Sequence, residues 1–483
     1  MLFDMNWRSA RLMASLFVLT LGRPGLGFSQ ETPSMIEVKS ILREASALIP
    51  MIDASQAWTI AANIAAKQTE AGDDEGALAT RTLVKGPNRT RTGGGVAYSL
   101  AAEGRLPQAL QPIAAMADGQ EKAVAYWQVT QALLKTAKYD DALTVARLIS
   151  KDPRETGRFL DCLLQIYAAQ SKAGDRQGAS ATLSEALAAV EREPEIPPGM
   201  SKPMPTILVY SYRPGMFRSI VHALVLAGNP EAARTVIARI STMAVQEQDS
   251  EKKKGILGPL AAAQADVGDF TVALRTVEPI KSDFFAQQTV IAAIATEQAR
   301  QGDVTEALVT LAGIPQGSNV GTLQAMSRTL SDLGNYSGAR AVVDKMKGPG
   351  ERAYGLASLA FEQCDKDPVG ANLNVTLAWK LAQEERHQAQ PFMFQNAVKF
   401  VAATRARLDD FTGALEIING PDLQDKAWPL AVLAQAMISV GKKDAALALS
   451  KSQDAPLVRA NSLLQIASSL MDQIEAANNK PKH

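Results

Sequence analysis

Cysteine, histidine and the catalytic motifs that depend on them are scarce in this chain of 483 residues. Only two cysteines are present, Cys162 and Cys364, so disulfides cannot form a framework that stabilises the fold. The three histidines stand far apart, at positions 222, 387 and 483, and the patterns HExxH, CxxC, GxSxG and Gly-Lys-Ser/Thr are absent. We therefore expect no metal site and no cofactor.

The chain also has no excess of positive or negative charge. Lysine and arginine total 50, and aspartate and glutamate also total 50, so the formal net charge is zero. A chain without a basic excess is poorly suited to neutralise a phosphate backbone, which argues against nucleic acid as the partner. Aromatic residues make up only 5% of the chain, whereas alanine is abundant. This composition favours closely packed helices over a β-sandwich.

Residues 1–29 have the pattern of a secretory signal peptide. Arg8 and Arg11 precede an apolar run, Leu12–Leu21, and small residues follow the helix-breaking Gly-Arg-Pro-Gly up to Ser29. A run of about ten apolar residues is too short to span a bilayer, which takes about 20. We expect cleavage near Ser29, export to a periplasmic or secreted location, and no membrane span in the mature chain. An uncleaved anchor or a disordered start is the alternative.

An internal repeat is the dominant feature of the remaining sequence. An alanine recurs eleven times, and in eight of these cases a glycine stands five residues before it. The spacing clusters at 32–34 residues, with longer intervals where segments are inserted. A period of this length indicates stacked supersecondary units. The recurring alanines are Ala77, Ala109, Ala142, Ala179, Ala233, Ala273, Ala307, Ala339, Ala371, Ala414 and Ala446.

The residues around each glycine predict a turn between two helices. Glycine can adopt the left-handed conformation that ends the first helix. The next residue can cap the second helix, as Asp303 does with Glu306 three positions later. Asn229-Pro230 and Asp367-Pro368 place a capping residue before a proline at the first helical position. Each unit is therefore expected to be a helical hairpin, with the alanine where two helices approach closely.

This pattern resembles the tetratricopeptide repeat family over roughly residues 57–455. Its period is 34, its second helix opens with Gly-Asp-x-x-x-Ala, and a large residue follows four positions after the alanine, as Leu311 and Val343 do here. Where that family has a tyrosine, this chain has a leucine or one of the glutamines Gln68, Gln170, Gln264 and Gln298. The resemblance implies an all-α, right-handed superhelical solenoid of about eleven hairpins. Other repeats built from paired helices are the alternative.

The repeat divides the chain into segments that we expect to form an open spiral with a cap at each end. Both cysteines fall inside hairpins five repeats apart, so we expect them to be free and buried. The segments are a signal peptide (1–29), an N-terminal capping helix (30–56), repeats 1–4 (57–190), a proline-rich insertion (191–214), repeats 5–11 (215–455) and a C-terminal capping helix with a tail (456–483).

The resemblance also implies where a ligand binds. In that family, ligands lie along the inner surface formed by the first helix of each hairpin. The family's carboxylate clamp pairs a Lys with an Asn one turn later, but here Ala403 stands one turn after Lys399, so recognition of a chaperone tail is not expected. The inner positions map onto Arg91, Tyr98, Trp127, Gln131, Asp161, Arg218, His222, Gln324, Arg328, Lys399 and Gln435.

Two functions of different class are compatible with the sequence. The first is a non-enzymatic, exported scaffold that binds a protein or peptide on its concave surface. The alternative is an all-helical exported enzyme of the α/α type that acts on a polysaccharide. For such an enzyme the residues to inspect are Tyr210, Tyr212, Arg213, Arg218 and His222, although no paired carboxylates accompany them.

Overall fold

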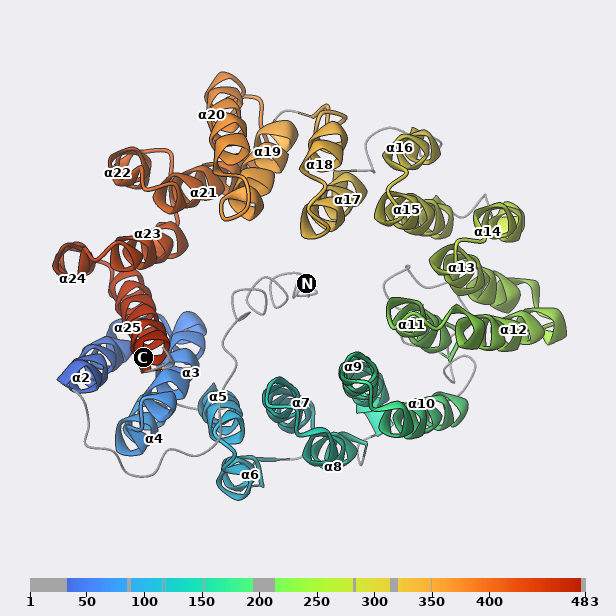
Figure 1. Cartoon of the computed structure of the whole chain (residues 1–483), viewed down its shortest axis with the longest axis horizontal. Helices are drawn as coiled ribbons and strands as arrows, with labels where there is room; N and C mark the ends of the chain where they lie inside the picture. The colour runs from blue at the N-terminus through green and yellow to red at the C-terminus, as the bar shows by residue number, and fades with distance from the viewer. Residues whose placement is uncertain are drawn as a thin grey trace, which may run out of the picture.

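The structure, a computed structural model, is a ring of α-helices (Figure 1). It describes residues 33–84, 88–114, 116–117, 119–150, 153–193, 213–280, 284–312, 320–348 and 350–478. Within these ranges the chain forms 24 α-helices and three short 3-10 helices, and no strand. The 3-10 helices are η1 (Ile49–Met51), η2 (Pro153–Glu155) and η4 (Glu278–Ile280).

Successive helices pack as hairpins, with one helix toward the centre of the ring and the next outside it (Figure 1). The inner helices are α3 (Ala54–Glu70), α5 (Asn88–Ala102), α7 (Gln120–Lys135), α9 (Thr156–Ala173), α11 (Arg213–Leu226), α13 (Ser250–Asp266), α15 (Phe284–Arg300), α17 (Val320–Asp332), α19 (Glu351–Gln363), α21 (Pro391–Arg407) and α23 (Ala427–Ser439). The outer helices are α4 (Asp74–Leu83), α6 (Leu106–Ala114), α8 (Tyr139–Ile149), α10 (Arg176–Glu191), α12 (Pro230–Gln246), α14 (Phe270–Val277), α16 (Val304–Ala312), α18 (Tyr336–Val343), α20 (Pro368–Glu384), α22 (Phe411–Asn419) and α24 (Lys443–Lys451).

The turn chemistry predicted from the sequence is confirmed. Every turn glycine that precedes a recurring alanine has a positive φ, between 71° and 95°. The predicted caps also form: Asp303 accepts a hydrogen bond from the backbone N–H of Glu306 at 3.1 Å, and Asp367 accepts one from Gly370 at 2.9 Å. Asn229 caps α12 in the same way, directly before its first-turn proline. Local sequence therefore determines where each hairpin turns.

The recurring alanines form the contacts between helices. All eleven are buried, and the most accessible of them, Ala179, is only 6% exposed. A larger side chain at these positions would hold neighbouring helices apart, and overpacking of this kind typically costs 1–3 kcal/mol. The periodic alanine is thus a packing requirement.

Buried glutamines tie the two helices of several hairpins together. The side-chain oxygen of Gln68 accepts a hydrogen bond from Thr80 at 2.6 Å, and Gln170 accepts one from Thr182 at 2.8 Å. Gln264 accepts a bond from Thr276 in the same arrangement. A buried amide oxygen would be costly without such a partner. In these three hairpins the glutamine that replaces the family's tyrosine therefore comes with a hydroxyl twelve residues later, whereas the side-chain oxygen of Gln298 is buried without a hydrogen-bond partner.

The two ends of the array meet, which corrects the expectation of an open spiral with a separate cap at each end. The first helix, α2 (Pro33–Ala47), packs against the last, α25 (Pro456–Asn478), and α25 also contacts α3 and α23 (Figure 1). Val38, Leu42 and Ala45 of α2 belong to one buried cluster with Leu463 and Ile466 of α25. The apolar stripes expected to cover two free ends instead cover each other, which removes both from water.

The helix α2 occupies the place of an outer helix whose inner partner is α25. Ser46 of α2 bonds to Thr80 of α4 at 2.7 Å, a separation of 34 residues that equals the repeat period. Arg340 of α18 bonds to Asn374 of α20 over the same separation. The seam of the ring is therefore a hairpin assembled from opposite ends of the chain.

Two of the predicted segments fall wholly or largely outside the described residues. The signal peptide (1–29) lies wholly outside them, as do residues 194–212 of the proline-rich insertion. Among the helices that are described, none combines the length and apolar character that crossing a bilayer would require.

Candidate peptide-binding surface

The inner helices carry every residue that the sequence mapping assigned to the binding surface. Arg91 lies in α5, but its side chain is outside the described part of the structure. His222 and Arg328 are exposed. The remaining mapped residues are partly exposed: Tyr98, Trp127, Gln131, Asp161, Arg218, Gln324, Lys399 and Gln435.

Trp127 and Asp161 connect α7 to α9. The indole Nε1 of Trp127 donates a hydrogen bond to Asp161 Oδ2 at 2.9 Å, and Gln165 Nε2 donates to the same oxygen at 2.8 Å. The indole is held by a charged acceptor, and bonds of this kind are stronger than neutral ones. This part of the surface presents a fixed aromatic ring.

Arg218 and His222 lie one turn apart on α11 and meet a buried carboxylate from α13. Arg218 Nε lies 3.4 Å from Asp266 Oδ2, and His222 Nδ1 lies 3.5 Å from Asp266 Oδ1. The Asp266 side chain is only 5% exposed, whereas that of His222 is 50% exposed. Asp266 therefore places a buried carboxylate beside two side chains that remain accessible from the surface.

Arg300 of α15 extends this charged row. It forms a bidentate pair with Glu297, with distances of 2.6 and 2.7 Å. Its bonds to Glu297, together with the nearby charge of Asp266, raise the pKa of the Arg300 guanidinium. Charges of alternating sign thus run across three neighbouring inner helices.

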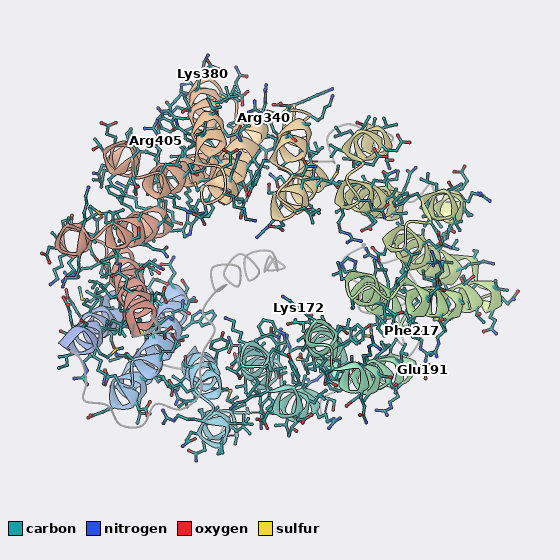
Figure 2. All side chains as sticks on the ribbon, viewed as in Figure 1. Lys172, Glu191, Phe217, Arg340, Lys380 and Arg405 are labelled. Carbon is teal, nitrogen blue, oxygen red and sulfur yellow. The ribbon has the colours of Figure 1, made fainter. Side chains whose placement is uncertain are left out.

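The mapping missed Asp266, although the sequence contains a signal for it. Two residues before the turn position, seven of the eleven hairpins carry a charged residue. In these seven hairpins the position lies in the last turn of the inner helix. The residues are Glu70, Lys135, Lys172, Asp266, Arg300, Asp332 and Arg407. In Figure 2, Lys172 lies on the side of the ring that faces its centre, whereas Lys380 lies outside.

An aromatic cluster, consisting of Tyr354, Phe361, Phe400 and Trp428, crosses α19, α21 and α23. The ring centroids of Phe361 and Phe400 are 5.6 Å apart, those of Phe400 and Trp428 are 5.0 Å apart, and Tyr354 lies 5.8 Å from Phe400. All four side chains are partly exposed. In a chain that is only 5% aromatic, this is a local concentration.

The inner positions assigned from the sequence did not include Tyr354 and Phe361, because the turn after α19 differs from the other turns. At most turns the residue after the glycine bonds back five positions, as Asp303 does to Gln298. At the α19–α20 turn, Asp367 bonds back only four positions, to Gln363. The exposed face of α19 is correspondingly shifted by one residue. The family positions Ala353 and Ala360 are buried, and Tyr354 and Phe361 are partly exposed in their place.

Carboxylates gather where the ring closes. Burial and the neighbouring carboxylate of Glu70 raise the pKa of Asp472 on α25, while Lys67 opposes this rise. Burial and the charge of Asp472 likewise raise the pKa of Glu475. Across the same region, burial and the charge of Glu70 raise the pKa of Tyr98 to about 12. The seam therefore holds carboxylates whose ionised forms are disfavoured.

Of the residues singled out for the enzymatic alternative, Tyr210 and Tyr212 lie outside the described residues. Arg213 begins α11, and its guanidinium donates to the backbone oxygens of Glu193 at 2.7 Å and Glu191 at 3.0 Å. Arg213 thus satisfies carbonyl groups at the end of α10, which is a structural role. Arg218 and His222 belong to the Asp266 cluster.

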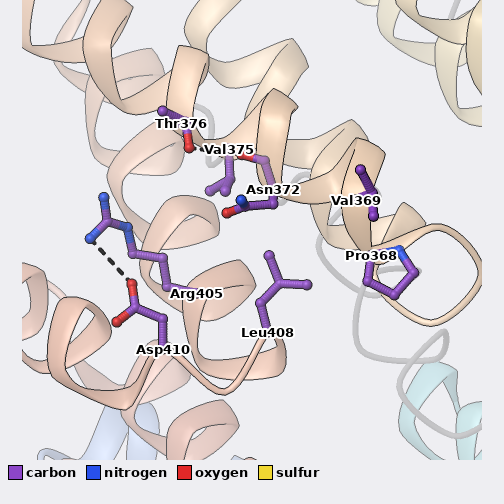
Figure 3. Close-up of a pocket in the computed structure, with 8 residues that line it drawn as sticks. All are labelled: Pro368, Val369, Asn372, Val375, Thr376, Arg405, Leu408 and Asp410. Atoms are coloured by element: carbon purple, nitrogen blue, oxygen red, sulfur yellow. Dashed lines mark hydrogen bonds and ion pairs between the residues drawn. The ribbon is translucent and has the colours of Figure 1, made fainter.

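Two further features of the described residues bear on chemistry. They contain no group of three His, Cys, Asp or Glu side chains placed to hold a metal ion. A cavity of about 520 Å³ lies beside α20 and the α21–α22 turn, with Arg405 and Asp410 paired at 3.5 Å on one wall (Figure 3). The cavity contains none of the mapped residues. Its lining is Pro368, Val369, Asn372, Val375, Thr376, Arg405, Leu408 and Asp410.

Comparison with known proteins adds little. No family model and no curated protein matches the chain. The crystal structure of Ton1535 from Thermococcus onnurineus NA1 is 14% identical, covers 78% of this chain and 99% of its own, and has a TM-score of 0.30. A circular tandem repeat protein with a novel repeat topology and enhanced subunit contact surfaces is 10% identical, with coverage of 92% and 98% and a TM-score of 0.16. Neither score supports an argument about fold or function.

Proposed function

We propose that this protein is a non-enzymatic scaffold that binds an extended polypeptide on the inner face of its ring. The observation that carries the proposal is the concentration of fixed polar and aromatic side chains on the inner helices. Trp127 is hydrogen-bonded to Asp161, Arg218 and His222 lie beside the carboxylate of Asp266, and the aromatic cluster crosses three helices. Side chains that are already ordered lose little entropy when a ligand binds.

The proposal includes the finer architecture expected from the sequence. The hairpins are tetratricopeptide-like, about eleven of them follow one another along the chain, and they wind with a right-handed sense. Support comes from the glycine turns, the aspartate caps and the buried alanines, which follow the repeat. An experimental structure would test the handedness and the number of repeats directly.

Export is also part of the proposal. The basic and apolar pattern of residues 1–29, with small residues up to Ser29, supports cleavage by a signal peptidase. N-terminal sequencing of the protein recovered from cell fractions is the test. A mature N-terminus near residue 30, outside the cytoplasm, is the expected result, and an intact Met1 in the cytoplasm would overturn it.

Peptide binding can be tested by site-specific photo-crosslinking. A photoreactive amino acid would replace Gln131 or Gln324 on the inner helices and, as controls, Lys380 or Thr144 on the outer helices. The probe is a library of unstructured peptides of about 15 residues. We expect crosslinks at the inner positions and few at the outer ones. Crosslinking confined to the outer positions, or no binding of any peptide, would exclude the proposed function.

A further inference from the structure

We propose that Asn419 is a site of spontaneous deamidation, and that its conversion loosens the loop between α22 and α23, residues 420–426. The sequence contains one Asn-Gly pair, Asn419-Gly420. Glycine has no side chain to shield its backbone nitrogen, so this nitrogen can reach the side-chain amide of the asparagine before it. The reaction is intrinsic to the chain and does not depend on what the ring binds.

The only co-reactant is water. The backbone nitrogen of Gly420 loses its proton to solvent and attacks Cγ of Asn419. The new N–Cγ bond forms as the Cγ–Nδ2 bond breaks, and ammonia leaves with the electron pair of that bond and a proton from solvent. Water then opens the five-membered succinimide. Opening at Cγ gives aspartate, whereas opening at the main-chain carbonyl gives isoaspartate, in which the chain runs through Cβ and Cγ.

The structure leaves this pair accessible for the reaction. Asn419 is exposed and is the last residue of α22. The Gly420 N–H donates to the Ile417 oxygen at 3.2 Å, at the long end of the range for such bonds. Helix ends fray, and fraying frees this nitrogen. The side chains of Asn335 and Asn374 are held by hydrogen bonds, whereas that of Asn419 makes none among the described residues.

The geometry of the turn explains why a glycine follows Asn419. A residue that precedes a proline is disfavoured in the helical conformation, and Gly420, which precedes Pro421, is extended with φ −67° and ψ 165°. A Cβ atom at Gly420 would lie 3.1 Å from the backbone oxygen of Glu416 and 3.3 Å from that of Ile417. The close approach of the chain to the end of α22 therefore favours the residue that makes Asn419 reactive.

Conversion would act on a loop that is anchored on both sides. Ile418 before the site and Leu423 after it are buried. Between them, Asp422 pairs with Arg386 at 2.5 Å, and its backbone oxygen accepts a hydrogen bond from Gln395 at 2.7 Å. Isoaspartate lengthens the main chain between these anchors. Either product also places a carboxylate at the C-terminus of α22, where negative charge is unfavourable. We therefore expect the contacts of Asp422 to weaken.

The same loop reaches the inner face of the ring. Asp425 pairs with Lys399 of the inner helix α21 at 2.7 Å. A loop that is loosened at residue 419 would hold Asp425 less firmly beside Lys399. Deamidation would thus change a position on the inner face without any enzyme.

The test uses the full chain, incubated for several days at pH 8 and at pH 6 and then digested with trypsin. Cleavage after Arg407 and Lys426 releases the peptide 408–426, in which Asn419 is the one asparagine. Asn372 is the internal control, since it is also exposed but is followed by leucine. Asn419→Gln is the matched variant, because its longer side chain would have to close a six-membered ring. Asn419→Asp supplies the charge without the longer main chain.

We expect mass spectrometry to show a gain in mass in peptide 408–426, with both aspartate and isoaspartate at position 419. Conversion should be faster at pH 8 than at pH 6, because loss of the amide proton starts the reaction. Asn372 should stay unconverted, and Asn419→Gln should lose the product. Hydrogen exchange of residues 420–426 should become faster in the incubated wild type, less so in Asn419→Asp, and should stay unchanged in incubated Asn419→Gln.

An unconverted Asn419 in the folded chain would overturn the inference. A synthetic peptide 408–426 that converts under the same conditions would then show that the fold blocks the reaction. Equal conversion of Asn372 would also overturn it, since the reaction would not depend on the glycine. Converted protein with unchanged exchange in residues 420–426 would overturn the proposed effect on the loop.

Discussion

Glu44 and Arg459 stand 415 residues apart in the chain and 2.7 Å apart in the structure. Lys451 lies 3.4 Å from the same carboxylate, and Glu37 pairs with Lys443 at 2.8 Å. These contacts join the first helix to the end of the chain and mark the seam of the ring. The paired side chains are partly exposed, and ion pairs of this kind contribute at most about 1 kcal/mol each. The buried apolar contact between α2 and α25 therefore supplies most of the closing energy.

The first prediction concerns this apolar contact. Leu42 of α2 is fully buried in the cluster that spans the seam, whereas Ile36 of the same helix is 55% exposed. Leu42→Ala should cost about 2–5 kcal/mol at the seam, because it leaves a cavity between α2 and its neighbours. Hydrogen exchange should then show reduced protection in α2 and α25, and small-angle scattering should show a larger radius of gyration.

Two control variants separate packing from charge at the seam. Ile36→Ala should leave the exchange pattern close to that of the wild type, and Glu44→Gln should have a smaller effect than Leu42→Ala. If Leu42→Ala leaves α2 as well protected as before, the ring is not held at this contact.

The second prediction concerns the carboxylates at the seam. The raised pKa of Asp472 means that the folded state binds its proton more tightly than the unfolded state does. Between the unfolded and folded pKa values, Asp472 therefore contributes stability that is lost as the pH rises. At neutral pH, Asp472→Asn should raise the free energy of unfolding by at most a few tenths of a kcal/mol, because the side chain is exposed and water screens its charge. Urea denaturation at pH 7 and pH 4 should show the gain only at pH 7.

The third prediction has the opposite sign. Arg43 of α2 holds both carboxylate oxygens of Asp73, at 2.7 and 2.8 Å, and despite burial lowers the pKa of that carboxyl. A lowered folded pKa gives stability that is present above the unfolded pKa and is lost as the pH falls through the folded one. Asp73→Asn should cost about 1.5–3 kcal/mol at pH 7 and much less at pH 3, measured by denaturant unfolding. Glu75→Gln, an exposed change in the helix α4 that Asp73 caps, should cost little at either pH.

The fourth prediction concerns the two thiols, which are free and buried, as the sequence indicated. Burial raises the pKa of Cys162 to about 12 and that of Cys364 to about 11. Since the thiolate is the reactive form, neither should react with Ellman's reagent in the native protein at pH 8, and both should react in denaturant. Rapid reaction of even one thiol before unfolding would contradict the packing around it.

Part of the proposed binding surface was predictable from the sequence. Arg218 and His222 were assigned to the inner face of a first helix because the number of residues between each of them and the turn glycine, Gly228, determines the side of the helix on which it lies. Asp266 was missed because its contact with them depends on how α13 packs against α11, although its charged repeat position was visible. Tyr354 and Phe361 were missed because the α19–α20 turn bonds back four residues instead of five, which shifts the exposed face by one position.

The sequence by itself determined the hairpins. Glycine at a left-handed turn, aspartate at a helix cap and alanine at a close contact are local requirements, and each acts within a few residues of its own position. Only the tertiary structure decided that the array closes. Closure depends on the small rotation between neighbouring hairpins, and that rotation accumulates from packing at every interface around the ring. No single residue determines this accumulated rotation. The apolar faces of α2 and α25 could therefore be recognised in the sequence, but their contact with each other could not.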